Sequence, residues 1–186
     1  MPGSAYTDAD LRWLREAIEL SRCSPPSETA FSVGAVLVSG DPARASTAVA
    51  TGFSRERDPH DHAEEVALAK AAEAPAGAAP AGLTDTVLSG PELTDAVLAG
   101  AGLGNATIYT SLEPCLRRLS RPRSCAQLIV AAGIRRVVLA WLEPPLFVPG
   151  GGAQWLREQG VTVVEVPELA DAARAVNAHL LPRMSR

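Results

Sequence analysis

Apolar residues follow two different spacings along this chain, and each spacing predicts one kind of element. Leu11, Leu14 and Ile18 recur at intervals of three or four residues, which is the spacing of one face of a helix. A capping-box pattern begins at Thr7, so a first helix is predicted over about residues 8–22. Runs rich in β-branched residues, continuous or alternating with polar ones, are typical of strands instead. Such runs predict strands over residues 31–38, 45–53, 107–111, 134–140 and 161–166.

Helical patterns separate several of these strands. Further helices are predicted from His62 to about residue 74, from residues 122–125 to 132, over 153–159 and over 168–181. The turn at Gly40-Asp41-Pro42 makes the first two strands antiparallel, whereas the helix over 153–159 makes the last two parallel. The sequence therefore predicts an α/β fold with a mixed five-stranded sheet. Gly34, inside the first strand, indicates either a close approach by another group or simple packing against a helix.

Length and composition limit the classes of protein to consider. A chain of 186 residues, 47% of them apolar, is typical of one globular domain, here spanning residues 1–186. The net charge of −4 argues against a general nucleic-acid-binding protein. No run of 18 apolar residues predicts a membrane span, and the first residues lack the pattern of a signal peptide. With three cysteines, two of them in a metal-like pattern, we expect a reducing, cytoplasmic environment.

Residues 75–104 form a low-complexity insertion. It contains a near-duplicate, Leu83–Leu88 and Leu93–Leu98, and two copies are too few for a repeat architecture. We expect a mobile loop or short helical turns at the surface. A role as an active-site lid or as a subunit contact is the alternative.

The candidate chemistry lies in two short stretches. The first is His62-Ala63-Glu64, and the second runs from Glu113-Pro114-Cys115 to Cys125. Together they approach the zinc-deaminase pattern H-x-E…P-C-x-x-C, although nine residues separate the two cysteines here instead of two. A catalytic zinc usually keeps three protein ligands and one open position for water. His62, Cys115 and Cys125 supply three such ligands, so a Zn²⁺ site is predicted.

Glu64 is the candidate proton carrier of this site. Zinc lowers the pKa of its water and makes a nucleophile near neutral pH, which attacks the ring carbon that bears an amino group. A carboxylate must then move the proton of the water to the ring nitrogen and to the departing ammonia. Glu64 lies two residues beyond His62 and is not itself a ligand, so it is assigned this role. The predicted reaction is hydrolytic deamination of an amino-substituted heterocycle.

Other titratable residues are expected to have ordinary roles. His60 is expected to be solvated or to support the site without binding the metal, because it lacks the glutamate that lies two residues beyond His62. Cys23 is expected to be a small buried apolar residue. Glu65 and His179 are expected at the surface.

The motifs resemble those of the cytidine-deaminase-like superfamily. Within it, the segments Thr110–Cys115, Ala131–Val138 and Glu143-Pro144, with the long gap before Cys125, resemble the deaminase half of the riboflavin-biosynthesis deaminase/reductase. The resemblance covers about residues 31–166.

This resemblance has consequences for the fold, the site and the assembly. It implies a three-layer α/β/α fold, with His62, Cys115 and Cys125 on zinc and with Glu64 as proton shuttle. It also implies a homodimer or a tetramer.

The likeness is weaker on the substrate side. The riboflavin enzymes usually carry Pro-Asn-Pro before the Val-Gly-Ala strand, whereas this chain has Thr29–Ala35, which is closer to the Phe-x-Val-Gly-Ala of nucleoside deaminases. The two histidines that usually follow Glu-Pro-Cys correspond here to Leu116-Arg117 or to Arg117-Arg118. The resemblance therefore does not carry the riboflavin-pathway substrate over to this chain.

Six residues are candidates for contact with a substrate. They are Phe31, Ala63, Pro114, Arg117, Arg118 and Trp141. The two arginines belong to a loop that also holds Arg121 and Arg123, and this loop is either a phosphate-binding site or a solvated loop paired with acids. Phe31 and Trp141 either stack on a heterocycle or pack in the core.

The main hypothesis is a zinc-dependent deaminase of a small molecule, either an aminopyrimidine of the riboflavin type or a cytidine or deoxycytidine nucleotide. A base deaminase of tRNA or single-stranded DNA is an alternative, but it would need a basic, aromatic-rich groove, and only 4% of the residues are aromatic. A deaminase of a guanine-type purine is a further alternative. A purely structural zinc site is disfavoured, because it usually has four protein ligands and needs no carboxylate such as Glu64.

Overall fold

The computed structural model describes residues 6–45, 47–73, 93–118, 120–147 and 150–181. Its centre is a five-stranded sheet in the order β2-β1-β3-β4-β5. The strands are β1 (Gly34–Ser39), β2 (Ala50–Phe53), β3 (Ala106–Thr110), β4 (Arg136–Leu139) and β5 (Thr162–Glu165). Strand β1 pairs antiparallel with β2 and β3, whereas β3, β4 and β5 run parallel. The predicted mixed sheet is confirmed, with its antiparallel first pair and its parallel last pair.

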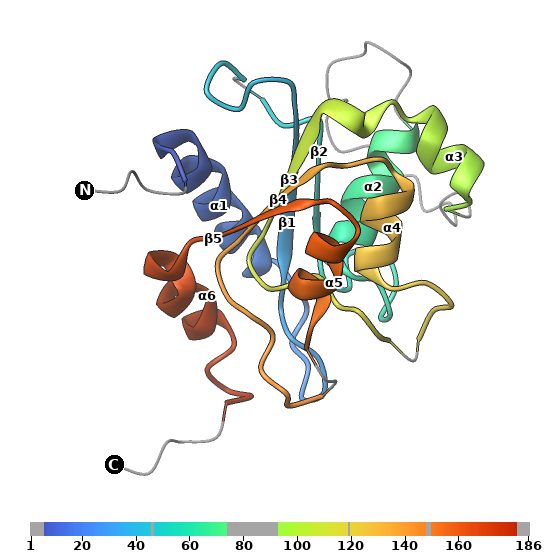
Figure 1. The fold of residues 1–186 in the computed structure, drawn as a ribbon. Coiled ribbons are helices and arrows are strands. Elements are labelled where there is room, and N and C mark those ends of the chain that lie inside the picture. Colours follow the sequence, from blue (N-terminus) through green and yellow to red (C-terminus); the bar gives the residue numbers. More distant parts are fainter. Residues whose placement is uncertain (1–5, 46, 74–92, 119, 148–149, 182–186) are drawn as a thin grey trace.

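Helices cover both faces of the sheet, which gives the three layers that the resemblance implied (Figure 1). Helices α1 (Asp8–Ser21) and α6 (Ala170–Val176) lie on one face. The other face carries α2 (Ala63–Glu73), α4 (Cys125–Ala131) and α5 (Gly152–Glu158), with α3 (Asp95–Gly100) beside them. No helix among the described residues is both long enough and apolar enough to cross a bilayer.

Alternate residues of each strand enter two separate layers of core. Val36 and Val38 of β1 pack with α1, whereas Leu37 packs in the layer that contains Leu68 of α2 and Ile129 of α4. This is the two-residue period of a strand with both faces buried.

The boundaries of several predicted elements differ. The strand predicted over 45–53 forms only over Ala50–Phe53. In two other elements, side chains take over backbone hydrogen bonds at the boundary. The strand predicted over 31–38 begins only at Gly34, because the backbone N–H of Ser32 donates to Asn177 Oδ1 at 2.7 Å. The helix predicted over 168–181 becomes a 3₁₀ turn, Pro167–Leu169, followed by α6. Asn177 follows α6 directly, and its amide donates back to the Ser32 carbonyl at 3.0 Å.

The predicted insertion is partly helical. Residues 95–100 form α3, and Leu103–Asn105 form a 3₁₀ turn, which agrees with the expectation of short helical turns. The rest of this prediction, over residues 75–92, lies outside the described residues.

The prediction for Cys23 is wrong, because this residue is exposed. Cys23 lies beyond Arg22, the C-cap residue of α1, so it is no longer on the buried face of the helix.

Two glycines let helices lie directly on the sheet. A Cβ atom at Gly34 would lie 2.1 Å from the carbonyl oxygen of Ala17 in α1. A Cβ atom at Gly52 would lie 2.4 Å from the carbonyl oxygen of Ala63 in α2. The two explanations considered for Gly34 therefore describe one feature, the close approach of a helix backbone. At Gly52 the same feature sets the position of the first turn of α2, where the candidate site begins.

A buried ion pair connects α1 to the sheet. Asp10 is 1% exposed and accepts hydrogen bonds from both terminal nitrogens of Arg136, at 2.8 and 3.0 Å. The hydroxyl of Tyr109 and the backbone N–H of Thr7 also donate to this carboxylate. Burial opposes the charge of Asp10, but these donors outweigh it and lower its pKa from 3.8 to about 2.

Replacing Asp10 with asparagine should lower the free energy of unfolding at pH 7 by about 2 kcal/mol, because the depressed pKa measures how strongly the fold favours this charge. The carboxylate stabilises the fold above the pKa of the unfolded chain, and this contribution is lost as the pH falls from about 4 towards about 2. Urea unfolding of both proteins at several pH values measures the effect. The difference between them should narrow below pH 4, and a difference independent of pH would contradict this account.

Candidate zinc-binding active site

The candidate site lies at the N-termini of α2 and α4 and at the C-terminal end of β3. His62 immediately precedes α2, and Glu64 lies in its first turn. Strand β3 ends at Thr110, from which a short turn leads to Cys115. Cys125 is the first residue of α4, as the sequence predicts.

The start of α4 is well capped, which fixes the backbone of Cys125. The Ser124 side chain accepts from the backbone N–H of Gln127, and the Gln127 side chain accepts from the backbone N–H of Ser124. The backbone N–H of Cys125 points at the sulfur of Cys115, at 3.4 Å. This hydrogen bond from the start of α4 favours the thiolate form of Cys115.

The structure brings the three predicted metal ligands together. Nδ1 of His62 lies 3.5 Å from the sulfur of Cys115 and 3.4 Å from that of Cys125. A sulfur at about 2.3 Å and a nitrogen at about 2.1 Å from one tetrahedral zinc are about 3.6 Å apart, so these separations fit the ion. Among the described residues, this is the one group of three or more His, Cys, Asp or Glu side chains close enough to share a metal.

The two thiols influence each other strongly. A hydrogen bond from the side chain of Cys125 lowers the pKa of Cys115 to about 4, and His62 contributes in the same direction against the effect of burial. The same hydrogen bond and burial raise the pKa of Cys125 well above its ordinary value. The thiolate form of Cys115 is thus favoured next to His62, which suits a cation, and thiols that bind a metal lose their protons.

Glu64 lies beside this group and is only 3% exposed. Its Oε1 is 2.8 Å from the hydroxyl of Thr110, which is also 2.9 Å from the carbonyl of Leu112. Burial, followed by the negative charge of Cys115, raises the pKa of Glu64. A carboxyl group with a raised pKa takes up and releases a proton more easily near neutral pH, which suits a general acid and base.

Glu113 holds the neighbouring loop against the site. Its buried carboxylate accepts three backbone hydrogen bonds, from Glu143 at 2.8 Å, from Gly151 at 3.2 Å and from Ala153 at 2.7 Å. A Cβ atom at Gly152 would lie 1.8 Å from the carbonyl oxygen of Pro114, so the start of α5 lies directly on the turn before Cys115.

Replacing Glu113 with glutamine should lower the free energy of unfolding by about 2 kcal/mol. The amide nitrogen of glutamine cannot accept a hydrogen bond, so at least one buried backbone N–H loses its partner. Chemical denaturation measures this change, with Glu158→Gln on the exposed surface of α5 as the control. Equal stability of both variants would show that Glu113 does not hold the loop.

Glu143 is a second carboxyl group near the sulfurs. Burial first, and then the charges of Cys115, Glu113 and Glu64, raise its pKa to about 8. Its Oε2 is buried and has no hydrogen-bond partner among the described residues. In the sequence, Glu143 stands out only within the Glu143-Pro144 segment of the family resemblance, which gives it no chemical role.

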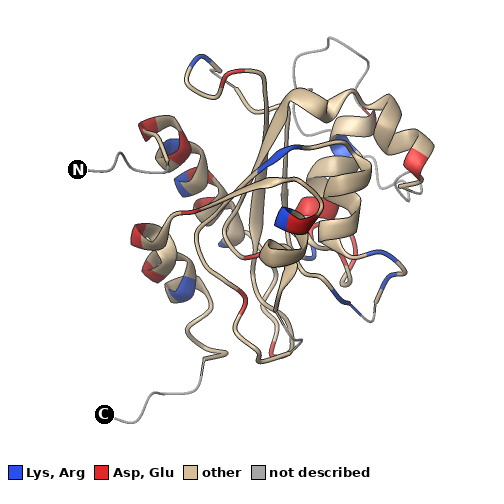
Figure 2. Ribbon diagram, in the orientation of Figure 1, with Lys and Arg blue, Asp and Glu red and all other residues tan. Residues whose placement is uncertain are grey.

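Most arginines of the loop after Cys115 are paired with acids. The arginines of this loop are drawn in blue in Figure 2. Arg121 lies 3.2 Å from Asp61, and Arg123 lies 2.8 Å from Asp95. The sequence allowed either a phosphate-binding loop or a solvated loop paired with acids. Arg121 and Arg123 are paired with acids. Arg117 is exposed and has no hydrogen bond or ion pair within the described part of the chain.

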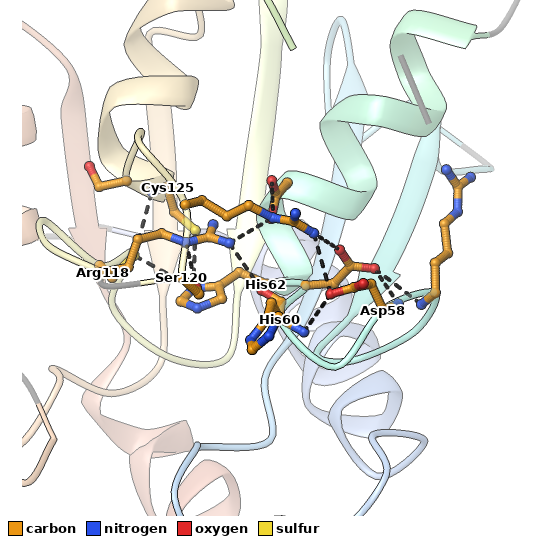
Figure 3. A network of polar contacts seen from close by, with 12 residues as sticks. Asp58, His60, His62, Arg118, Ser120 and Cys125 are labelled. Atoms are coloured by element: carbon orange, nitrogen blue, oxygen red, sulfur yellow. Dashed lines mark hydrogen bonds and ion pairs between the residues drawn. The ribbon is translucent and has the colours of Figure 1, made fainter. Parts of the chain in front are cut away.

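Arg118 differs from its neighbours because its side chain is only 3% exposed. Its Nη2 donates to Glu65 Oε2 at 2.9 Å and to the backbone carbonyl of His60 at 3.0 Å (Figure 3). The expectation for Glu65 was incomplete, because its side chain is 18% exposed and forms part of this ion pair. His60 and His179 are exposed, as expected.

The remaining candidates for substrate contact are buried. The rings of Phe31 and Trp141 are each 7% exposed, and their centroids lie 5.5 Å apart in an edge-to-face arrangement. Both belong to the core layer beside α1. Ala63 is fully buried, and Pro114 is buried in the turn before Cys115. A role in substrate binding stays a prediction for these residues and for the two arginines.

Comparison with known proteins decides the family. Residues 7–141 match the family described as "Cytidine and deoxycytidylate deaminase zinc-binding region". The chain belongs to this family. The predicted zinc cofactor agrees with both this family and the His-Cys-Cys group.

Relatives of this deaminase-family chain are named either as a pyrimidine deaminase or as riboflavin biosynthesis proteins. Over 152 residues it is 36% identical to the diaminohydroxyphosphoribosylamino-pyrimidine deaminase of Schizosaccharomyces pombe, and the match covers 82% of this chain and 30% of that protein. A match to the riboflavin biosynthesis protein RibD of Aquifex aeolicus is 38% identical over 79 residues and covers 42% of this chain and 22% of that protein. The chain thus spans less than a third of the length of these relatives.

Solved structures confirm the predicted fold. The Rib2 deaminase of Aspergillus oryzae, a C-terminal deletion mutant in complex with DARIPP, has a TM-score of 0.64 at 25% identity and covers 93% of this chain and 96% of its own. RibD of Acinetobacter baumannii has a TM-score of 0.62 at 26% identity, over 91% of this chain and 38% of its own.

Proposed function

We propose that this protein is a zinc-dependent hydrolytic deaminase of a pyrimidine that carries amino groups and a phosphoribosylamino substituent. The observation that supports it most is the position of Glu64, a buried carboxyl group beside, and separate from, three side chains that fit one zinc ion. A structural zinc site would have no use for such a group.

The chain's own residues divide the work of this reaction. His62, Cys115 and Cys125 would hold the zinc, which when bound lowers the pKa of water and supplies a nucleophile near neutral pH. Glu64 would take a proton from the attacking water and pass it to the ring nitrogen. It would then carry the proton of the newly added hydroxyl group to the departing amino group. Thr110 orients the Glu64 carboxyl through Oε1. Water adds to the carbon, the carbon–nitrogen bond breaks, and a carbonyl group and ammonia result.

The substrate class rests on the relatives. The protein of Schizosaccharomyces pombe is named for a diaminohydroxyphosphoribosylamino-pyrimidine, and its match covers most of this chain. A nucleic-acid substrate is less well supported, because Arg118, Arg121 and Arg123 already pair with acids, whose charges oppose the approach of a phosphate backbone. Arg117 is the exposed arginine of this loop that remains free, among the described residues, to contact a phosphate.

An ammonia-release assay of the zinc-loaded protein tests the proposed function. The panel compares the phosphoribosylamino-pyrimidine with its dephosphorylated form, cytidine, deoxycytidine monophosphate, guanine and an aminotriazine. We expect the highest kcat/KM for the phosphorylated pyrimidine, and no ammonia from the Glu64→Gln protein. A higher kcat/KM for a cytidine compound or for guanine would overturn the substrate assignment, and no ammonia from any compound would overturn the activity.

We also expect the protein to act as a homodimer or tetramer in the cytoplasm. The exposed large apolar side chains Leu142, Leu146 and Phe147 follow β4 and support a contact between copies. A monomer by light scattering at working concentration would contradict self-association.

A further inference from the structure

A buried arginine lies between the two halves of the candidate metal site. Arg118 comes three residues after Cys115 in the sequence. Its Nε donates to Ser120 in the same loop, and its Nη2 reaches the other side of the site. Its Nη2 donates to the carbonyl of His60 and to the carboxylate of Glu65, at 3.0 and 2.9 Å. His60 and Glu65 flank His62 in the sequence, so one guanidinium connects the cysteine loop to the segment that carries the histidine (Figure 3).

Glu65 alone does not satisfy this guanidinium. Nη1 of Arg118 is buried and has no hydrogen-bond partner within the described residues. A buried cation with an unpaired N–H is unfavourable unless anions lie close to it. Burial does oppose the charge of Arg118, but the negative charges of Cys125, Glu65 and Cys115 outweigh burial and raise its pKa. When a metal binds, both cysteines would be thiolates, and their negative charges would act on the Arg118 guanidinium.

We propose that Arg118 is a positioning residue of the metal centre. Its guanidinium holds the loop between Cys115 and Cys125 against the start of α2, and it offsets part of the negative charge of the two sulfurs. This inference rests on the proposed metal site. Arg118 would then support the metal ligands, and it would not bind a phosphate group of the substrate.

Cobalt substitution tests the role, because absorption by a Co²⁺–thiolate centre includes a sulfur-to-metal charge-transfer band. A positive charge beside the sulfurs stabilises their electrons and moves the band to shorter wavelength. Replacing Arg118 with methionine should therefore move the band to longer wavelength. Glu65→Gln keeps a hydrogen-bond acceptor for Arg118 but removes the opposing charge, so it should move the band to shorter wavelength. Arg117→Met removes an exposed charge of the same loop and should leave the band in place, because solvent screens that charge.

Metal affinity, measured by competition with a chelator, tests the positioning part. Arg118→Met should bind Co²⁺ about 10-fold to 100-fold more weakly, as is usual when a group that orients metal ligands is removed. Arg118→Lys keeps the charge and loses the forked geometry. Its band should stay near that of the unmodified protein, while its affinity should fall about 10-fold.

The outcomes separate this inference from the proposed function. No charge-transfer band in the unmodified protein would overturn the metal site itself. A normal band that neither Arg118→Met nor Glu65→Gln moves, or that both move in the same direction, would overturn the role of Arg118 alone. Unchanged affinity in both Arg118 variants would do the same for positioning. If Arg118→Met does not fold, a shift to shorter wavelength in Glu65→Gln still supports the inference, and no shift contradicts it.

Discussion

Replacing Glu64 with glutamine should lower kcat for ammonia release by about 100-fold to 10⁴-fold, with zinc still bound. Glutamine has almost the same shape, and its amide oxygen can still contact the hydroxyl of Thr110, so the surroundings of the side chain are preserved. The amide cannot take up a proton from water or deliver one to the ring. The buried position of Glu64 leaves little room for bulk water to replace this function.

The measurement combines steady-state ammonia release with zinc content per chain, before and after the substitution. Glu73→Gln at the other end of α2 is the matched control, because it makes the same chemical change in an ion pair with Arg57 away from the sulfurs. Retained turnover in Glu64→Gln would remove Glu64 from the mechanism. Loss of zinc together with activity would instead show that Glu64 acts as a metal ligand.

Replacing Cys125 with serine should weaken zinc binding by about 100-fold or more and abolish activity with it. Cys125 is fully buried, and its sulfur lies 3.4 Å from Nδ1 of His62. A serine hydroxyl is shorter than the thiol and does not ionise near neutral pH, so the site loses one of its two anionic ligands. The long gap between the cysteines makes this assignment the least secure part of the motif when only the sequence is considered.

Competition with a chelator gives the zinc affinity of this variant. Cys23→Ser is its control, because Cys23 is exposed and lies outside the metal-binding group of the described residues. We expect Cys23→Ser to bind zinc as the unmodified protein does. Unchanged zinc binding in Cys125→Ser would contradict the proposed ligand set.

The sequence predicted which three side chains come together to fit a metal, because metal chemistry restricts the residue types. Only histidine, cysteine and carboxylates suit zinc, and the spacing of His62, Glu64 and Cys115 fixes their positions at a helix start and a strand end. The pattern of apolar residues likewise predicted that all five strands exist, because strands that pack in a covered sheet are rich in apolar residues.

The support around the ligands was not predicted, because it depends on contacts between residues far apart in the chain. Thr110 reads as an ordinary strand residue, yet its hydroxyl reaches Glu64. Glu113 belongs to the motif, but its three backbone partners lie 30 or more residues later. Arg118 meets Glu65 across 53 residues. The one sign in the sequence is an excess of arginine after Cys115, close in space to the acids of the loop before His62.

The burial of Cys23 was mispredicted for a related reason. Free cysteines are usually buried, but a helix end decides the matter here, since α1 stops at Ser21 and the buried face stops with it. Residue type gives a tendency, and the position of a helix end depends on the local backbone.

X-ray absorption at the zinc edge of the loaded protein tests the central claim most directly, because it counts the atoms bound to the metal. We expect two sulfur atoms at about 2.3 Å and two nitrogen or oxygen atoms at about 2.0–2.1 Å, one of them from His62 and one from water. Four protein ligands with no exchangeable position, or a first shell with fewer than two sulfurs, would contradict the claim.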